Sequence, residues 1–424
     1  MKQITIRGWT RIALFNLFIV ACLGLLMRLK ILLPLPWLDQ RFTLHAHSHF
    51  AFSGWISHVL MLSVAVLVSE RTFSGMLPVR YNRLLAFNLF CSYGMLVSFL
   101  IQGYAAISIT FSTLSILVCF IFYRLCQTDI SVNGQKQVWY KFIHAALIFN
   151  MISCLGTFLL AWTMATQPGN TVLRLASVYF YLHFQYNGWF FFGIMGLFHQ
   201  WLYLQKISLP NALIQFRLFA ISCVPIYLLS INWMAFPAAL HVLTILTALI
   251  QFVVFSSFVR ALWKRKDKIA AGLSPVMRCV LTAVAIASVI KFGLQTASSL
   301  PTIAHFAFGL RPVVIAYLHL VLLGIISLFL ICWLYMNKAL KTTRVTAFGI
   351  IIFVSGIIFN EFFLLVQGIS SLSDTYISGM SQALAIAALI LVTGIVVILQ
   401  ENIIPVAKSS YCQTVKLTPP RRLD

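Results

Sequence analysis

The stretch TLHAHSHFAFSGW, Thr43–Trp55, places three histidines at the start of an apolar run that continues to Val68. An imidazole is costly in hydrocarbon unless it is hydrogen-bonded or ligates something, so His45, His47 and His49 need partners elsewhere in the chain. His45 and His49 are four residues apart and share one face of a helix, whereas His47 points to roughly the opposite side. At most two of the three can therefore face one cofactor.

The composition is that of a polytopic membrane protein. Of the 424 residues, 61% are hydrophobic and only 9% are charged, which is far outside the range of soluble proteins. The nine cysteines are scattered and form no CxxC pair, so we interpret them as small hydrophobic residues. The first apolar run is too long for the core of a cleavable signal peptide, and we expect it to be retained as a helix.

Apolar stretches long enough to cross about 30 Å of hydrocarbon occur along the whole chain. They predict an all-α fold, a polytopic membrane bundle of twelve transmembrane helices, because helices satisfy their own backbone in lipid. We expect one membrane domain, residues 1–401, without an internal repeat, followed by a basic cytoplasmic tail, residues 402–424. The predicted spans are residues 12–33, 45–68, 84–102, 106–123, 142–163, 175–203, 213–231, 236–259, 276–299, 313–335, 346–368 and 379–400.

The net charge of +22 arises from the loops between the predicted spans. If both termini are cytoplasmic, 24 of the 30 Lys and Arg residues lie on the cytoplasmic side and five on the other, with Lys291 inside a span. Such asymmetry is a positive-inside signal. It predicts a multi-pass protein of a bacterial cytoplasmic (inner) membrane with both termini in the cytoplasm, and it argues against a nucleic-acid partner.

With this orientation, seven of the ten histidines fall in the outer third of the predicted bundle. His183, His241 and His319 lie near the outer ends of three further spans, at the depth of the histidines in the quoted stretch. Imidazoles at one depth on facing helices are typical of a haem or transition-metal site in a bundle core. The alternative is that each histidine is a hydrogen-bonded helix-end residue, but their clustering favours a cofactor.

Two helical segments resemble haem-copper oxidase subunit I proteins. RPVVIAYLHLVLLG, Arg311–Gly324, resembles the helix in which two histidines, two residues apart, ligate a high-spin and a low-spin haem. The resemblance implies that His319 ligates the low-spin haem and that Tyr317 stands at the high-spin position. HFQYNGW, His183–Trp189, resembles the nitric oxide reductase form of the family, which implies that His183 is a metal ligand.

The binuclear centre of that family is incomplete in this chain. Asn187 stands where the family has an acidic metal ligand, and Leu229 and Ser230 stand where it has a histidine pair, ahead of the matching Trp233 and Pro237. Oxygen reduction by the family's usual centre is therefore not expected.

Two substitutes for the missing ligands are open. A tyrosinate can ligate haem iron, so Tyr317 is a candidate ligand of a second haem. His241 follows the proline of the motif by one helical turn and is a candidate partner of His183 in holding copper or iron.

The resemblance also implies that the low-spin haem, of b type, lies between a histidine of the second span and His319. We rank His49 first as this partner, His45 second because it shares the same face, and His47 third.

Four charged residues in or near the spans have predicted roles. Arg311 and Arg174 lie at the outer surface, about two turns before His319 and His183, and are candidate partners of haem propionates. Lys291 and Glu361 lie deep in their spans at similar depth, and we expect them to form an ion pair.

The predicted function is that of a membrane haem protein which binds a low-spin haem for electron transfer or for a redox or gas response. Expected partners are membrane lipid, haem and a redox partner subunit, cytochrome c or quinone. One alternative is an oxidoreductase, an active oxygen or nitric oxide reductase with an altered metal centre. Another is a non-haem twelve-helix transporter, which is expected to show related halves or paired broken helices that this sequence lacks.

Overall fold

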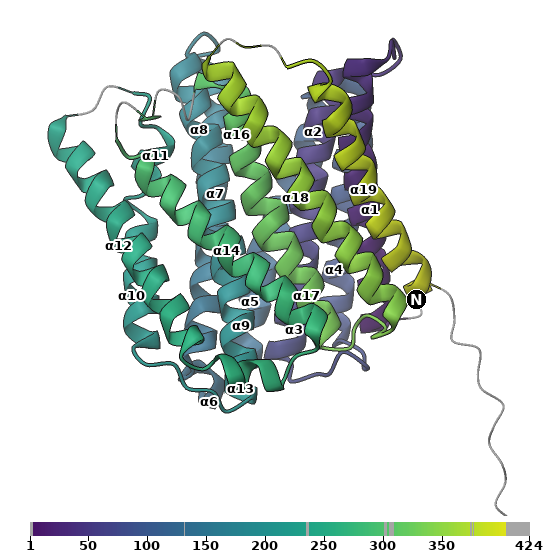
Figure 1. Ribbon diagram of the computed structural model, residues 1–424, viewed down its shortest axis with the longest axis vertical. Coiled ribbons are helices and arrows are strands. Elements are labelled where there is room, and N and C mark those ends of the chain that lie inside the picture. Colours follow the sequence, from purple (N-terminus) through teal and green to yellow (C-terminus); the bar gives the residue numbers. More distant parts are fainter. Residues whose placement is uncertain are drawn as a thin grey trace, which may run out of the picture.

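The computed structural model describes residues 3–130, 132–234, 237–300, 303–304, 309–373, 375 and 377–403, and these form an all-α bundle (Figure 1). Within them, ten helices are long and apolar enough to cross a membrane, where the sequence predicted twelve. The predicted tail lies outside the described residues from residue 404 onward. The ten candidate spans are α1 (Ile6–Leu32), α2 to α3 (Gln40–Val68), α4 (Val79–Gln102), α5 (Ala106–Asp129), α7 (Val138–Thr166), α12 (Ala238–Trp263), α14 (Pro275–Ala297), α16 to α17 (Arg311–Met336), α18 (Arg344–Leu372) and α19 (Met380–Ile403).

The other two predicted spans differ from these ten for separate reasons. Residues 175–203 do lie in one helical segment, formed by α8 (Thr171–His183), η2 (Phe184–Phe190) and α9 (Phe191–Leu204). Its many polar residues lower its hydropathy below that of the candidate spans. Residues 213–231 form only the 12-residue α10 (Ala212–Cys223) and the single turn α11 (Tyr227–Ser230).

The proline at position 225 explains the short α10. A proline has no backbone N–H and clashes with the preceding turn, so a helix commonly ends before it. At about 1.5 Å per residue, the 12 residues of α10 extend only about 18 Å.

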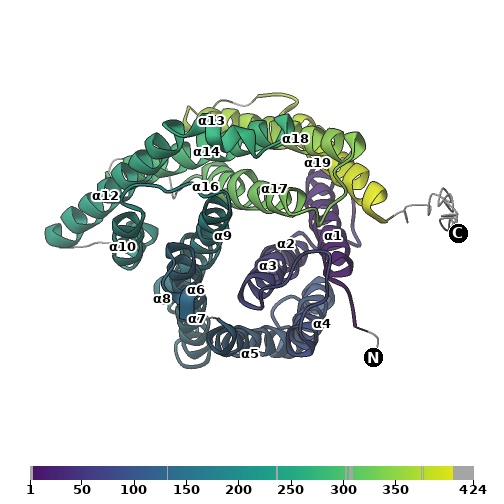
Figure 2. The same cartoon turned by 90° about the horizontal axis from the view of Figure 1, so that it is seen from below.

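The second span is the centre of one half of the bundle. Viewed along the helices, α2 and α3 are surrounded by α1, α4, α5, α7, α9 and α17 (Figure 2). In the most apolar window of this span 78% of the residues are buried, more than in any other candidate span. The span formed by α16, η3 (Leu320–Ser327) and α17 lies inside an arc of α12, α14 and α18 (Figure 2).

The two ends of the bundle differ in what they contain. The N-terminus and the short helices α6 (Val132–Gln135) and α13 (Lys266–Ala271) lie at one end, and α2, α8 and α16 begin at the other (Figure 1). The basic run Lys264–Lys268 is therefore at the N-terminal end, and the histidines of the second span are near the opposite end.

Three spans share a feature that the sequence analysis did not predict. Each contains a π-helical segment, η1 (Ala51–Ser57), η2 or η3, which begins one or two residues after a histidine. Aligned at these histidines, the segments read HSHFAFSGW (47–55), YLHFQYNGW (181–189) and YLHLVLLGI (317–325). Each has His or Tyr, then His two residues later and Gly five residues after that. The sequence analysis did not predict this shared motif, and π-helical turns are frequent at functional sites.

Two hydrogen bonds connect the three repeated segments. The indole Nε1 of Trp55 in η1 donates to Ser327 Oγ in η3 at 2.9 Å. The indole Nε1 of Trp189 in η2 donates to Ser57 Oγ in η1 at 3.1 Å. Trp55 and Trp189 hold the same place in the repeat, as do Ser57 and Ser327, so the two bonds follow one pattern around the centre of the bundle. The third repeat has Ile325 in place of tryptophan, so the corresponding side-chain hydrogen bond is absent there.

Replacing Trp55 by phenylalanine is expected to lower the free energy of unfolding by about 1–3 kcal/mol, because it leaves the buried Ser327 hydroxyl without its donor. Trp333→Phe is the matched control, since Trp333 is also 1% exposed but its indole N–H has no hydrogen-bond partner. It should leave stability unchanged or raise it. Thermal denaturation of both variants in detergent tests this, and equal losses in the two variants would contradict a role for the bond.

Candidate functional site

His47 of α2 and His319 of α16 lie near the end of the bundle where these two helices begin. His47 Nδ1 lies 3.0 Å from the carbonyl oxygen of Val20 in α1. His319 Nδ1 lies 2.8 Å from the carbonyl oxygen of Ile315, one turn earlier in α16. The two imidazoles are close enough to interact electrostatically. A carbonyl only accepts, so Nδ1 donates in both rings and each Nε2 is left with a lone pair that can bind a ligand.

Two arginines lie beside this imidazole pair. Arg28 of α1 interacts electrostatically with His319 and also with Arg311 at the start of α16. Sequence reasoning selected Arg311 but missed Arg28, although Arg28 is one of the few basic residues on the side of the bundle opposite to the termini. Neither arginine forms an ion pair within the part of the chain that the structure describes, and two adjacent guanidinium groups favour an anionic ligand.

The helix that contains His319 is incompletely covered by protein. No residue of α16 from Arg311 to His319 is buried, although the span lies inside the arc of α12, α14 and α18 (Figure 2). His47 is also only partly buried. Both histidines are therefore only partly covered by the protein.

His45 and His49 lie on the opposite face of α2, toward α4. His49 Nε2 is 2.9 Å from the hydroxyl oxygen of Tyr104, and its ring stacks on Phe99 with centroids 4.4 Å apart. The His45 ring meets the Tyr104 ring edge-on at 4.7 Å. The predicted division of the triplet is confirmed, because His47 contacts α1 and interacts electrostatically with His319, whereas His49 contacts Tyr104. The ranking of the three as haem ligands stays a prediction.

Tyr317 points to another side of α16 than His319. Its ring lies 6.3 Å from the ring of Tyr186 in η2. The two-residue offset between Tyr317 and His319 thus presents them to different neighbours, as the helical period requires.

His183 is buried and both of its ring nitrogens have protein partners. Nε2 lies 2.9 Å from the carbonyl oxygen of Cys223, and Nδ1 lies 3.2 Å from Asn187 Nδ2. Neither nitrogen is therefore open to a metal in this conformation. Within the described residues, no three His, Cys, Asp or Glu side chains are placed to hold a metal ion.

The remaining predicted site residues lie elsewhere in the bundle. His241 is in the first turn of α12 and is partly exposed. Arg174 is in the first turn of α8, a helix that packs against α7 and α11. The metal role of His241 and the propionate role of Arg174 stay predictions.

Lys291 and Glu361 do not form the predicted ion pair. Lys291 Nζ donates to Gln295 Oε1 at 2.7 Å and lies 4.0 Å from the centre of the Phe292 ring. Glu361 accepts a hydrogen bond from Asn360 at 3.1 Å. The similar depth of the two residues was predicted, but their side chains point to different neighbours.

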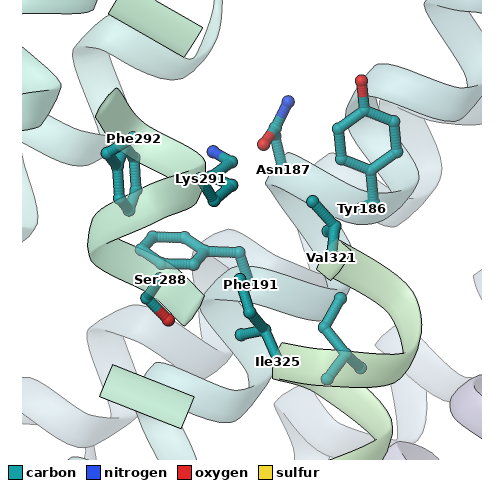
Figure 3. A pocket seen from close by; sticks show the side chains of 9 residues that line it. Tyr186, Asn187, Phe191, Ser288, Lys291, Phe292, Val321 and Ile325 are labelled. Atoms are coloured by element: carbon teal, nitrogen blue, oxygen red, sulfur yellow. The ribbon is translucent and has the colours of Figure 1, made fainter. Parts of the chain in front are cut away.

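A chain of side-chain hydrogen bonds continues from Lys291 across three helices. Gln295 Nε2 donates to Gln251 Oε1 at 2.7 Å, and Gln251 Nε2 donates to Ser222 Oγ at 3.0 Å. On its other side, Lys291 borders a small cavity together with Tyr186 and Asn187 (Figure 3). The cavity has room for about one water molecule and not for a haem.

No model of a known protein family matches the chain, and no curated protein is detectably similar to it. The choice among functions therefore depends on the geometry described above.

The variant Gln295→Leu is expected to destabilise the protein by about 1–3 kcal/mol, because it leaves the buried Lys291 ammonium without its acceptor. The double variant Lys291→Met/Gln295→Leu removes the donor as well and should recover part of the loss. Thermal denaturation of the wild type, both single variants and the double variant gives the coupling energy. A coupling energy near zero would show that the 2.7 Å contact between Nζ and Oε1 contributes nothing.

Proposed function

We propose that this chain is a membrane haem protein in which His47 and His319 are the two protein ligands of one low-spin, b-type haem, for electron transfer or a redox response. One observation carries the proposal. Both imidazoles donate through Nδ1 to a backbone carbonyl, at 3.0 Å and 2.8 Å, while their Nε2 atoms are left for a ligand in the same interior region. Histidines that bind metals commonly have this second hydrogen bond, which fixes the tautomer and orients the ring.

The surrounding residues fit a haem. His47 and residues 312–319 of α16 are only partly covered by the protein, so a haem could contact them. Arg28 and Arg311 would pair with the two propionates, whose charges offset the repulsion between the guanidinium groups. When bound between two histidines, a haem supplies one-electron chemistry and has no open position for a gas.

The protein residues then have three tasks. The carbonyls of Val20 and Ile315 hold the ligand tautomers, and the arginines anchor the carboxylates. The tryptophan-to-serine bonds of η1, η2 and η3 hold the second span and the span of α16 at a fixed separation. A rigid pair of histidine ligands would favour electron transfer, because neither His47 nor His319 would have to move when a bound haem gains or loses an electron.

Nothing in the described residues supports extending the proposal to a reductase centre. Such a centre needs ligand nitrogens near His183, and both of its own are hydrogen-bonded. The cavity beside Tyr186 is also too small for a second haem. The transporter alternative expects two related halves, whereas three spans of this chain share one motif.

We also propose a bacterial cytoplasmic membrane as the location, with both termini in the cytoplasm. The proposal is supported by the basic run of α13, which lies at the same end as the N-terminus (Figure 1). The haem then lies near the outer side. Its electron partner would be a subunit, a cytochrome c or a quinone that approaches there.

Replacing His47 or His319 by alanine is expected to abolish the haem spectrum, because each substitution removes one of two axial ligands. His49→Ala should retain the haem, since His49 faces Tyr104. His144→Ala in α7 serves as a control for general effects of losing a histidine. Pyridine haemochrome assays on the purified variants measure haem per chain. Loss in His49→Ala with retention in His47→Ala would reassign the ligand to His49.

Replacing Arg28 by glutamine is expected to lower the midpoint reduction potential of the haem, on the order of tens of millivolts, because a nearby positive charge stabilises the reduced, less positive state. Haem content should remain the same, since no ligand is lost. A spectroscopic redox titration against the wild type measures the shift, with Arg174→Gln as a charge-matched control. An upward shift, or equal shifts in both variants, would place Arg28 away from the haem.

A further inference from the structure

The face of α2 that does not face His319 contains a second cluster of donor atoms. His45, His49 and Tyr104 meet there over the ring of Phe99. The two histidines interact electrostatically with each other, and the Tyr104 ring contacts both, at 4.7 Å and 5.8 Å between centroids. Three potential ligands from two elements thus lie together at the end of the bundle where α2 begins.

The turn between α4 and α5 is built to place Tyr104 over α2. Gly103 has a φ of +62°, in the left-handed region that favours glycine. A Cβ atom at this position would lie 2.5 Å from the ring of Phe42 in α2. Only glycine allows the turn to approach α2 this closely, so the contact between Tyr104 and the histidines is a fixed feature of the fold.

One potential metal ligand in the cluster has no hydrogen-bond partner within the described residues. His45 Nε2 is buried and makes no hydrogen bond. Two further buried polar atoms without a partner, Gln40 Oε1 and Gln102 Nε2, lie at the same ends of α2 and α4. Buried polar atoms of this kind are rare, and an ion or an ordered water is a common reason for them.

We propose that His45, His49 and Tyr104 form a binding site for a divalent transition-metal ion of the Zn²⁺ type. Histidines four residues apart on one helix face can bind a single ion, as in other zinc sites. His49 Nε2 and Tyr104 Oη are 2.9 Å apart. Two ligands of one tetrahedral zinc ion are separated by about 3.3 Å, given bonds of about 2.0 Å. The two donors thus need to move little to bind the same ion, with water as a fourth ligand.

The charges near the cluster do not oppose an incoming cation strongly. His45 interacts electrostatically with Asp39 and with Arg41, which have opposite charges and precede it by six and four residues. Asp39 is exposed and caps the N-terminus of α2. An ion can therefore reach His45 from the end of the bundle beside an acidic side chain.

This site is separate from the proposed haem site. The haem ligand of the second span, His47, is on the other face of α2, and none of the three metal donors faces His319. Either proposal, for the metal or for the haem, can therefore fail without affecting the other.

The test is equilibrium dialysis of the full chain in detergent against Zn²⁺, with the metal and the haem measured in the same samples. The protein carries an affinity tag without histidines, and the exposed Cys279 is replaced by serine in every sample to remove its thiol. We expect one Zn²⁺ per chain, with affinity reduced by roughly tenfold or more in His45→Ala and in His49→Ala. His144→Ala is the matched control and should bind as the wild type does, and haem content should be equal in all four proteins.

A second measurement remains useful if a variant folds poorly. Cu²⁺ bound to the wild-type chain should give an electron paramagnetic resonance spectrum with hyperfine structure from two imidazole nitrogens. The proposal is overturned if the wild type binds no Zn²⁺ above the level of the double variant His45→Ala/His49→Ala. It is also overturned if His144→Ala loses as much affinity as His45→Ala.

Discussion

Two hydrogen bonds from indole N–H groups to serine hydroxyls connect the spans on which the whole bundle depends. Trp55 and Trp189 donate to Ser327 and Ser57, respectively, and so join the three repeated segments. In an apolar interior an unpaired donor is costly, so these bonds fix the rotation of each span about its own axis. That rotation decides which way the histidines one to two turns away point.

The repeated segment of His, π-helical turn and Gly holds different polar side chains in each of its three copies. In the first repeat, His47 faces α1 while His49 faces α4. In the third, His319 lies near His47, and Tyr317 contacts Tyr186 of the second repeat. Lys291 lies beside that second repeat. Its amino group donates to the side-chain amide oxygen of Gln295 and lies over the Phe292 ring. One structural unit thus borders three separate polar regions.

Much of this arrangement could be predicted from the sequence. The lengths of the apolar stretches predicted membrane-spanning helices. The helical period predicted that His45 and His49 lie on one face of a helix and His47 on another. The repeat was also readable, because HFAFSGW and HFQYNGW share four of seven letters, but the third copy has lost its tryptophan and most of the match. The short α10 was not predicted, since the effect of one proline is local and hydropathy averages over it.

Other features depend on the rotation of each helix relative to its neighbours. The periodicity of one sequence does not predict that rotation. The choice of His47 over His49 depends on which face of α2 meets α16. The separation of Lys291 from Glu361 likewise depends on rotation, because depth along an axis does not fix direction around it. Arg28 joined the site only through the packing of α1, which brings Arg28 close enough to interact electrostatically with His319.

The most direct test of the central claim is the reduced-minus-oxidised visible spectrum of the purified wild-type chain, with the haem quantified per chain and carbon monoxide then added. A bis-histidine site predicts sharp low-spin bands, one haem per chain and no change on adding carbon monoxide. A chain without haem after expression with ample haem supply would contradict the account, as would a haem that binds carbon monoxide.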